Sequence, residues 1–350
     1  MRDVAIVAFA QTKHVPRTNL TTVELLVPVI ADALAAAGLE RPQVDFWCHG
    51  SCDYLSGQPF SFVAAVDAIG AWPPIVESHV EADGAFALYE AWVKLQTGEA
   101  DTAVVFGNGK SASGDTRRIL TLQLDPYYVA PLWPDAVSLA ALQARAALDA
   151  GVVTPLDMAE VAARSRRDAA TNPSAVVQDG AAAAAALLRA PVQADPLRAH
   201  DLPPPTDGAA AVVLAAGNAA RAVCERPAWI RGIDHRIDGH DIGRRDLTAV
   251  PSATLAAERA GARGRFDVAE LHAPFSHEEL LLRRTMAVDA DAINPSGGAL
   301  CANPVMAAGL VRFGEVAARI HRGEAGRGLA HATSGPCLQQ NLVAVLEADE

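Results

Sequence analysis

The stretch that decides the fold reads Ile75-Val-Glu-Ser-His-Val-Glu-Ala-Asp-Gly-Ala-Phe-Ala-Leu-Tyr-Glu-Ala-Trp92. Residues 74–76 predict a short apolar strand, and apolar residues at helical spacing after Gly84 predict a helix that ends at Gly98. Between them we expect a polar turn that contains Glu77, His79, Glu81 and Asp83. Such a turn is where α/β enzymes place reactive groups, because a helix N-terminus stabilises negative charge. This turn has carboxylates and a histidine, but no cysteine or serine in the pattern of a nucleophile.

Strands and helices alternate on both sides of this stretch. Residues 3–9 and 44–50 predict strands, and residues 21–37 and 60–69 predict helices. Residues 102–106 predict the strand that follows the Gly84 helix. This alternation indicates an α/β fold whose sheet is mostly parallel and covered by helices.

Length, charge and cysteine content exclude several classes of protein. The chain has 350 residues, 51% of them hydrophobic, and a formal net charge of −12. We therefore expect a globular protein that binds neither nucleic acid nor an anionic membrane, and no apolar run approaches the roughly 20 residues of a membrane span. The five scattered cysteines favour reduced thiols in the cytoplasm. The segment Cys48-His-Gly-Ser-Cys52 lacks a second ligand pair at zinc-site spacing, so we expect no metal site.

The composition changes at about residues 111–205, which we interpret as a block inserted into the first half of the fold. It contains the aromatic and proline-rich segment Leu124-Asp-Pro-Tyr-Tyr-Val-Ala-Pro-Leu-Trp-Pro-Asp135, followed by alanine-rich helical stretches. We expect the block to cover the edge or the top of the sheet. The strand pattern Asp207-Gly-Ala-Ala-Ala-Val-Val-Leu214 returns to the core, and a second αβ half begins near Arg226.

An internal repeat relates the two halves. At one common offset, Gly84, Glu90, Gly98, Glu99 and Ala100 recur as Gly309, Glu315, Gly323, Glu324 and Ala325. In both copies a strand-like stretch follows and ends in small residues and glycine. The repeat favours a duplicated fold.

Four segments together resemble the thiolase superfamily, and within it the lipid-transfer-protein thiolases related to sterol carrier protein x. They are the Gly84 helix with Gly98-Glu-Ala-Asp101, Asp207-Gly-Ala-Ala-Ala-Val212, Glu270-Leu-His-Ala-Pro-Phe-Ser-His-Glu-Glu-Leu280 and Asn294-Pro-Ser-Gly-Gly298. Residues 78–94 look like the actinobacterial branch associated with steroid degradation. The resemblance implies a thiolase-like α/β fold, in which two duplicated αβα halves form a five-layered αβαβα sandwich with an inserted loop domain. We place the N-terminal half at 1–220, with its loop domain at about 111–205, and the C-terminal half at 221–350.

The chain departs from the thiolase pattern where thiolases carry their reactive groups. The nucleophilic cysteine of the family's Cys-Ala-Ser-Gly turn aligns with Glu81, and the acid/base cysteine of His-Asp-Cys-Phe aligns with Pro274. The histidine of the latter motif is retained as His272, whereas the activating histidine of Gly-His-Pro aligns with Asn303. Thiolases need a thiolate, a base that generates it and a second acid/base. We therefore expect no acyl transfer through an acyl-cysteine.

Several polar residues remain candidates for the site. The catalytic candidates are His272 and Glu81 as bases, Asn303 as an oxyanion donor, and His331. The candidate substrate-binding residues are His79, Asp83, Cys301, Tyr127 and Trp133. Each also has a structural interpretation: Glu81 and Asp83 fit helix caps, the two aromatic residues fit packing of the loop domain or a dimer, and Cys301 and Cys337 fit small buried residues.

Three functions follow from the resemblance. The first is an acyl-CoA-processing protein that cleaves a carbon–carbon bond of a steroid or lipid side-chain CoA thioester by a retro-aldol reaction, within a heteromeric complex. The second is a catalytically degenerate thiolase subunit that supports an active paralogue, and the third is an acyl-CoA acetyltransferase or thiolase. Coenzyme A is expected as part of the substrate, with no tightly bound cofactor. The expected partners are a second thiolase-like chain, in a homo- or heterodimer, and a zinc-ribbon/OB-fold companion protein.

Overall fold

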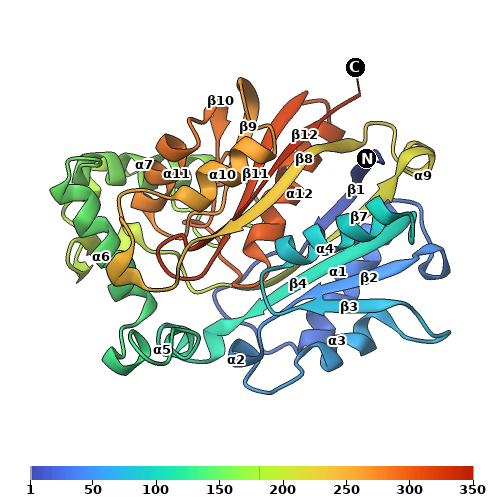
Figure 1. Cartoon of the computed structure of the whole chain (residues 1–350), viewed down its shortest axis with the longest axis horizontal. Coiled ribbons are helices and arrows are strands. Elements are labelled where there is room, and N and C mark those ends of the chain that lie inside the picture. The colour runs from blue at the N-terminus through green and yellow to red at the C-terminus, as the bar shows by residue number, and fades with distance from the viewer. Residues whose placement is uncertain (1, 181, 350) are drawn as a thin grey trace.

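The computed structural model describes residues 2–180 and 182–349 and has a ten-stranded sheet at its centre (Figure 1). The strand order is β10-β9-β11-β12-β8-β1-β7-β4-β2-β3. The first half supplies β1 (Val4–Gln11), β2 (Phe46–Gly50), β3 (Glu77–Val80), β4 (Thr102–Lys110) and β7 (Asp207–Ala216). The second half supplies β8 (Ala228–Ile237), β9 (Arg265–Leu271), β10 (Asp289–Ile293), β11 (Arg327–Ser334) and β12 (Gln340–Glu347).

The two sets of five strands have the same topology. From the outer edge inward the first half runs β3-β2-β4-β7-β1 and the second runs β10-β9-β11-β12-β8. In each half the outer three strands are parallel and the inner two are antiparallel to their neighbours. The halves join through a short antiparallel contact between β1 and β8. The duplicated fold that the repeat predicts is therefore confirmed.

The two five-stranded halves of the ten-stranded sheet form two β layers, called the two sheets below, and helices form three layers around them. On the outer face of the first half lie α1 (Thr22–Ala36) and α3 (Phe62–Ile69), and on the outer face of the second lie α10 (Pro251–Arg259) and α11 (Ser276–Thr285). Between the two sheets lie α4 (Gly84–Thr97) and α12 (Ala308–His321), which contact each other. The remaining short helices outside the inserted block are η1 (Arg41–Gln43), α2 (Asp53–Ser56), α9 (Gly217–Val223) and η5 (Ile242–Arg244). This is the predicted αβαβα sandwich.

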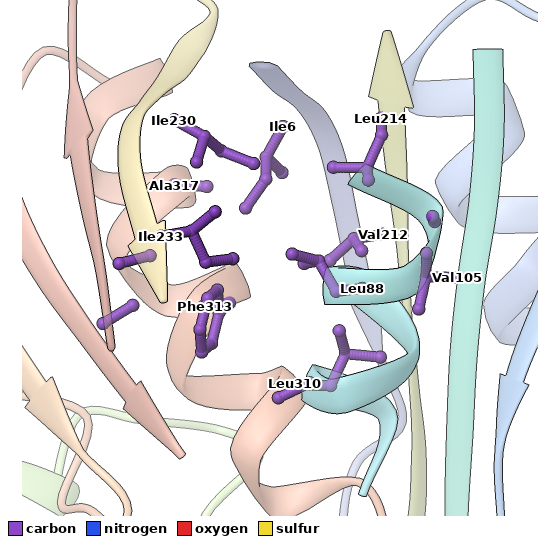
Figure 2. Packing of buried hydrophobic residues seen from close by; sticks show 14 of the residues in the cluster. Ile6, Leu88, Val105, Val212, Leu214, Ile230, Ile233, Leu310, Phe313 and Ala317 are labelled. Atoms are coloured by element: carbon purple, nitrogen blue, oxygen red, sulfur yellow. The ribbon is translucent and has the colours of Figure 1, made fainter. Parts of the chain in front are cut away.

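The core between the sheets explains why glycines recur in the repeat. Leu88 of α4 and Leu310 and Phe313 of α12 pack among strand residues of both halves (Figure 2). A Cβ atom on Gly84 would come within 3.0 Å of the Leu310 side chain, and one on Gly309 would come within 2.6 Å of Asp83. The two repeated glycines thus let the N-terminal turns of α4 and α12 approach each other.

The inserted block connects β4 to β7 and packs on the second half of the molecule. It consists of η2 (Ser111–Ser113), α5 (Thr116–Thr121), η3 (Ala130–Leu132), α6 (Ala136–Asp149), α7 (Pro155–Ala169), α8 (Ala184–Leu187), β5 (Val192–Ala194), β6 (Leu197–Arg198) and η4 (Ala199–Asp201). Apolar residues of α6 and α7 share a core with α10 and α11. Figure 1 shows α7 beside α11. The block therefore covers the outer helices of the half to which it does not belong in sequence.

The strand predicted at residues 74–76 is wrong, because the structure places β3 at Glu77–Val80. Pro73 and Pro74 have no backbone N–H to donate, so the parallel ladder with β2 begins only after them. Glu77 and His79 consequently belong to an edge strand rather than to a turn. A polar edge strand of this kind is common, since it discourages unwanted pairing.

Within the described ranges, every helix is too short or too polar to cross a membrane.

Candidate active site

A cavity of about 740 Å³ opens where the inserted block meets the carboxyl ends of β9 and β11. One wall comes from α5, α6 and the proline segment 203–205. The opposite wall comes from the segments that follow β9 and β11 and from the loop before α12. Most of the lining side chains are apolar, and the polar ones include three predicted site residues, Asp83, His272 and Asn303.

His272 and Asn303 form a hydrogen-bonded pair in the cavity wall. His272 directly follows β9, where its backbone N–H donates to His331 O and extends the pairing of β9 with β11. Its Nε2 lies 3.1 Å from Asn303 Oδ1, and its Nδ1 lies 3.4 Å from the backbone nitrogen of Thr333. Because a backbone N–H can only donate, Nδ1 accepts, and the ring proton lies on Nε2 and is donated to Asn303. Burial lowers the pKa of His272 to about 4, which keeps the ring neutral.

This arrangement leaves the amide nitrogen of Asn303 free to bind a ligand. Among the hydrogen bonds of the described residues, none uses Asn303 Nδ2, whereas the backbone nitrogen of Asn303 donates to Thr206 Oγ1 over 3.1 Å. The side chain is therefore fixed at its oxygen by His272 and at its backbone by Thr206. Such a fixed N–H donor suits an oxygen that gains negative charge during a reaction.

Glu278 brings a carboxyl group to the same cavity. It is the third residue of α11, and its Oε2 accepts a hydrogen bond of 3.1 Å from the backbone nitrogen of Phe275 at the helix N-cap. The side chain has no ion-pair partner in the described part of the chain. Burial raises the pKa of Glu278 to about 8, and the backbone hydrogen bond from Phe275 opposes the shift.

Cys337 is a thiol in the cavity wall, but its environment does not favour a thiolate. Its Sγ donates to Leu139 O over 3.4 Å, and burial raises the pKa of the thiol to about 12. A nucleophilic cysteine needs the opposite environment, with a nearby positive charge or base that lowers its pKa. Pro274 also lines the cavity and has no titratable group.

Asp83 lies at the base of the cavity, where it caps two helices. Its Oδ1 accepts from the backbone nitrogens of Ala85 and Leu310, and its Oδ2 accepts from that of Gly309. One carboxylate thus satisfies the N-termini of α4 and α12 together. Burial raises the pKa of Asp83, while these three N–H groups act in the opposite direction.

The other predicted site residues do not line the cavity. Glu81 is exposed and accepts from the backbone nitrogen of Asp53 over 2.7 Å, and His79 stacks on Phe62 with ring centroids 3.8 Å apart. Tyr127 is 82% exposed and Trp133 is 50% exposed. The structure brings His272, Asn303 and Asp83 together at one cavity and leaves these four outside it.

Two predicted residues are buried beside the cavity rather than in its lining. His331 bonds through Nε2 to Asn341 Oδ1 over 2.9 Å, and burial lowers its pKa to about 3. Cys301 packs against Ala169 and Ala175 of the inserted block, and burial raises its pKa to about 12.

Buried ion pairs hold the loops that carry the site. Glu270 at the end of β9 pairs with Arg312 of α12 over 2.6 Å and accepts from Ser296 over 2.8 Å. Glu279 pairs with Arg164 of the inserted block over 2.5 Å and accepts from Asn294 over 2.8 Å. These contacts explain the Asn294-Pro-Ser-Gly-Gly motif, whose polar side chains position the segment around His272 without lining the cavity.

Glu278 is a buried carboxyl group of the cavity that the sequence interpretation did not select as a site residue. Its place three residues into a helix reads as an ordinary capping position. A sequence signal for Glu278 exists: two adjacent glutamates follow shortly after the motif histidine His272. Neighbouring positions on a helix point in different directions, so the two carboxyl groups are expected to have different surroundings. The structure separates them: Glu279 points to Arg164, and Glu278 lines the cavity. Among the described residues, no three His, Cys, Asp or Glu side chains come together as a metal site would require.

Comparison with known proteins places the fold. No protein-family model matches the chain. An acetyl-CoA acetyltransferase of Methanothermobacter thermautotrophicus is 26% identical, over 93% of each chain. An acetyl-CoA acetyltransferase of Methanocaldococcus jannaschii is also 26% identical, over 90% of this chain and 89% of the relative. Among solved structures, one named "Ltp2-ChsH2(DUF35) aldolase" superposes with a TM-score of 0.80 at 20% identity, over 99% of this chain and 98% of the other.

The chain therefore has a thiolase-like α/β fold along its full described length. The likeness to two acetyl-CoA acetyltransferases over at least 90% of this chain supports the thiolase superfamily, while the steroid-degradation branch stays a prediction.

Proposed function

We propose that the protein cleaves a carbon–carbon bond of an acyl-CoA thioester by a retro-aldol reaction, without an acyl-cysteine intermediate. The observation that carries the proposal is the His272–Asn303 pair: a fixed amide donor in a cavity whose one lining cysteine, within the described residues, has a raised pKa. The names of the similar proteins support an acyl-CoA substrate, and the name of the similar structure supports aldol chemistry.

The amide of Asn303 fits the requirement of a retro-aldol step. When the bond between C2 and C3 of a 3-hydroxyacyl thioester breaks, its electron pair moves onto C2 and the thioester oxygen as an enolate. Asn303 Nδ2 would donate to that oxygen, and neutral His272 would hold the amide with its nitrogen toward the substrate. Because His272 uses both ring nitrogens in hydrogen bonds, we assign it this positioning role rather than that of the base.

The cavity supports a substrate with a bulky apolar acyl group. Its volume of about 740 Å³ and its largely apolar walls would accept a branched or ring-bearing lipid chain, such as a steroid side chain, while coenzyme A extends toward solvent. Coenzyme A would arrive as part of the substrate, and the proposal requires no tightly bound cofactor.

Partner chains are part of the proposal. The similar structure is named as a complex of two proteins, which supports a heteromeric assembly for this chain as well. Strand β3 is an open edge of the sheet, and exposed apolar side chains lie in the segments near it, among them Phe60, Trp72 and Val76. An edge of this kind suits a second thiolase-like chain.

The test uses purified protein with a branched 3-hydroxyacyl-CoA, alone and together with the proteins that copurify with it. We expect release of a ketone and of a shortened acyl-CoA in equal amounts. If no ketone forms under either condition, the retro-aldol proposal fails, and the chain is better explained as a catalytically degenerate subunit. Thiolysis of a 3-oxoacyl-CoA by free CoA would instead support the acetyltransferase alternative.

A further inference from the structure

The proposed reaction needs a group that takes up and returns a proton, and the cavity offers few. His272 has both ring nitrogens in hydrogen bonds, and Asp83 has both oxygens in hydrogen bonds to helix N-termini. Cys337 donates to a backbone carbonyl. Asp115 also faces the cavity, but it is exposed and accepts from the backbone nitrogen of Arg118. Glu278 differs from these four residues, because it is buried and uses one carboxyl oxygen in a single hydrogen bond, from Phe275, among those of the described residues.

A comparison with its neighbour in the sequence shows how unusual Glu278 is. Glu279 is equally buried, but it forms an ion pair with Arg164 over 2.5 Å and accepts from Asn294. Glu278 is 4% exposed, has no cation beside it in the described part of the chain, and lines the cavity. Buried carboxyl groups without a cation are costly for stability. Such a residue is commonly retained for chemistry rather than for folding.

We propose that Glu278 is the catalytic acid–base of this cavity: it removes the proton of the substrate's 3-hydroxyl group and then delivers that proton to C2. The inference rests on the proposed retro-aldol function and names the proton-transfer residue for it. It is independent of Glu81, which lies outside the cavity.

The step balances without a further reactant. The Glu278 carboxylate takes the hydroxyl proton, the C3–O bond becomes a carbonyl, and the C2–C3 bond breaks. The electron pair of that bond moves into the enolate, whose oxygen accepts from Asn303 Nδ2. The protonated Glu278 then gives its proton to C2, which yields the shortened acyl-CoA and restores the carboxylate. The ketone is the second product, and nothing is oxidised or reduced overall.

The position of Glu278 suits both protonation states. The N-terminus of α11 and the N–H of Phe275 stabilise the carboxylate, whereas burial stabilises the acid. Burial raises the pKa of Glu278 to about 8, so the two forms interconvert near neutral pH. The other titratable or charged groups that face the cavity are Asp83 from α4, Asp115 and Arg117 from α5, His272 after β9 and Cys337 after β11.

The pH dependence of the rate follows from these groups. As the pH rises toward about 8, Glu278 ionises and becomes able to accept a proton, so the rate increases. The pKa of His272 lies near 4 and that of Cys337 near 12, so neither changes its protonation in this range. We therefore expect the rising limb near 8 to be lost in Glu278→Gln.

The test compares wild type with Glu278→Gln, which keeps the oxygen that accepts from Phe275 and removes the transferable proton. Glu160→Gln, the same chemical change at an exposed position of α7, is the matched control. We expect kcat of Glu278→Gln for a 3-hydroxyacyl-CoA to fall by about 10²–10⁴, with KM nearly unchanged and the rising pH limb lost. A kcat within about threefold of wild type with the same pH profile would overturn the proposal.

A second measurement separates this inference from the proposed function. In infrared difference spectra at neutral pH, we expect a protonated-carboxyl band that is absent from Glu278→Gln and that shifts when an uncleavable 3-deoxy acyl-CoA binds. If wild type cleaves no 3-hydroxyacyl-CoA but the band shifts, the retro-aldol function fails and the contact of Glu278 with the ligand stands. If the band is absent or insensitive to the ligand, the assignment of Glu278 fails.

Discussion

Two strand-to-helix connections, one from each half of the duplicated fold, differ in where their polar side chains point. The connection from β3 to α4 uses its groups locally: Glu81 accepts from Asp53, His79 stacks on Phe62, and Asp83 caps two helices. The connection from β9 to α11 sends His272 and Glu278 into the cavity. The family resemblance of the sequence predicts a nucleophile on the first connection. Here the second connection provides the groups that remain free for chemistry.

The difference has a physical cause in the inserted block. The block packs on α10 and α11 and closes the cavity over the segment after β9. The turn after Val80 lies at the open edge strand β3, and its residue Glu81 is exposed. Burial changes the pKa of a side chain and strengthens its hydrogen bonds, whereas an exposed carboxylate keeps ordinary solvation. Reactive groups are therefore expected on the buried connection.

The largest expected effect tests the structural role of the first connection. Asp83→Ala leaves three buried N–H groups without an acceptor, and each such group costs about 1–3 kcal/mol, so we expect a loss of at least about 3 kcal/mol in the free energy of unfolding. Denaturant titration measures this loss. A loss below about 1 kcal/mol would mean that Asp83 is not the shared cap of α4 and α12.

The second effect concerns the pH dependence of stability caused by the second connection. The folded pKa of Glu278, about 8, lies above its ordinary value of 4.5, so between these values the folded state holds a proton that the unfolded state has released. Stability due to this group is therefore present below pH 4.5 and decreases as the pH rises to about 8. Glu278→Gln removes this decrease, which is on the order of 5 kcal/mol at about 1.4 kcal/mol per pKa unit.

The measurement is a set of denaturant titrations of wild type and Glu278→Gln across that pH range. We expect the variant to become progressively more stable than wild type as the pH rises, and the difference to level off above about 8. If the free energy of unfolding of the two proteins depends on pH in the same way, Glu278 has an ordinary pKa. The second connection would then perturb its carboxyl group no more than the first connection does.

The third effect tests the oxyanion donor that the second connection holds. Asn303→Ala removes the amide and leaves His272 Nε2 without its acceptor. We expect kcat for carbon–carbon cleavage to fall by about 10²–10³, as for other oxyanion-hole donors. Steady-state kinetics with a 3-hydroxyacyl-CoA measure the change. Retention of most of the activity would place the enolate away from His272 and Asn303.

The smallest effect is expected at Glu81. Its exposed carboxylate accepts from the backbone nitrogen of Asp53 and hydrogen-bonds the Cys52 thiol, so Glu81→Ala should change the free energy of unfolding by about 0.5 kcal/mol or less. Because Glu81 does not line the cavity, kcat should stay within about threefold of wild type. A large fall in kcat with unchanged stability would indicate that Glu81, on the first connection, is the general base.

The fold could be predicted largely from the sequence, because its signals are local and repeated. Alternating strand and helix patterns, the Gly84 and Gly309 repeat and four family-like segments agree with the topology and with the fold of a similar structure. The strand near residue 75 was misplaced, since apolar character suggested 74–76 while two prolines moved the pairing to polar residues 77–80. Polar edge strands have no hydrophobic signature to find.

The site could be predicted only in part, because side-chain direction depends on contacts between distant segments. His272 and Asn303 were found through motifs, and the structure brings them within 3.1 Å of each other. The different surroundings of Glu278 and Glu279 depend on Arg164, which lies more than a hundred residues away in the inserted block. Sequence spacing alone places both glutamates in the first turn of a helix and does not distinguish their surroundings.

The most direct test of carbon–carbon cleavage without a thiolate is the stoichiometry of products from a branched 3-hydroxyacyl-CoA in the absence of free CoA, in wild type and in Cys337→Ser. Serine keeps a donor for Leu139 O but offers no thiolate. We predict equal amounts of ketone and shortened acyl-CoA from both proteins, at rates within about threefold of each other. A strict requirement for free CoA, or loss of product in Cys337→Ser, would contradict the account and indicate thiolase chemistry.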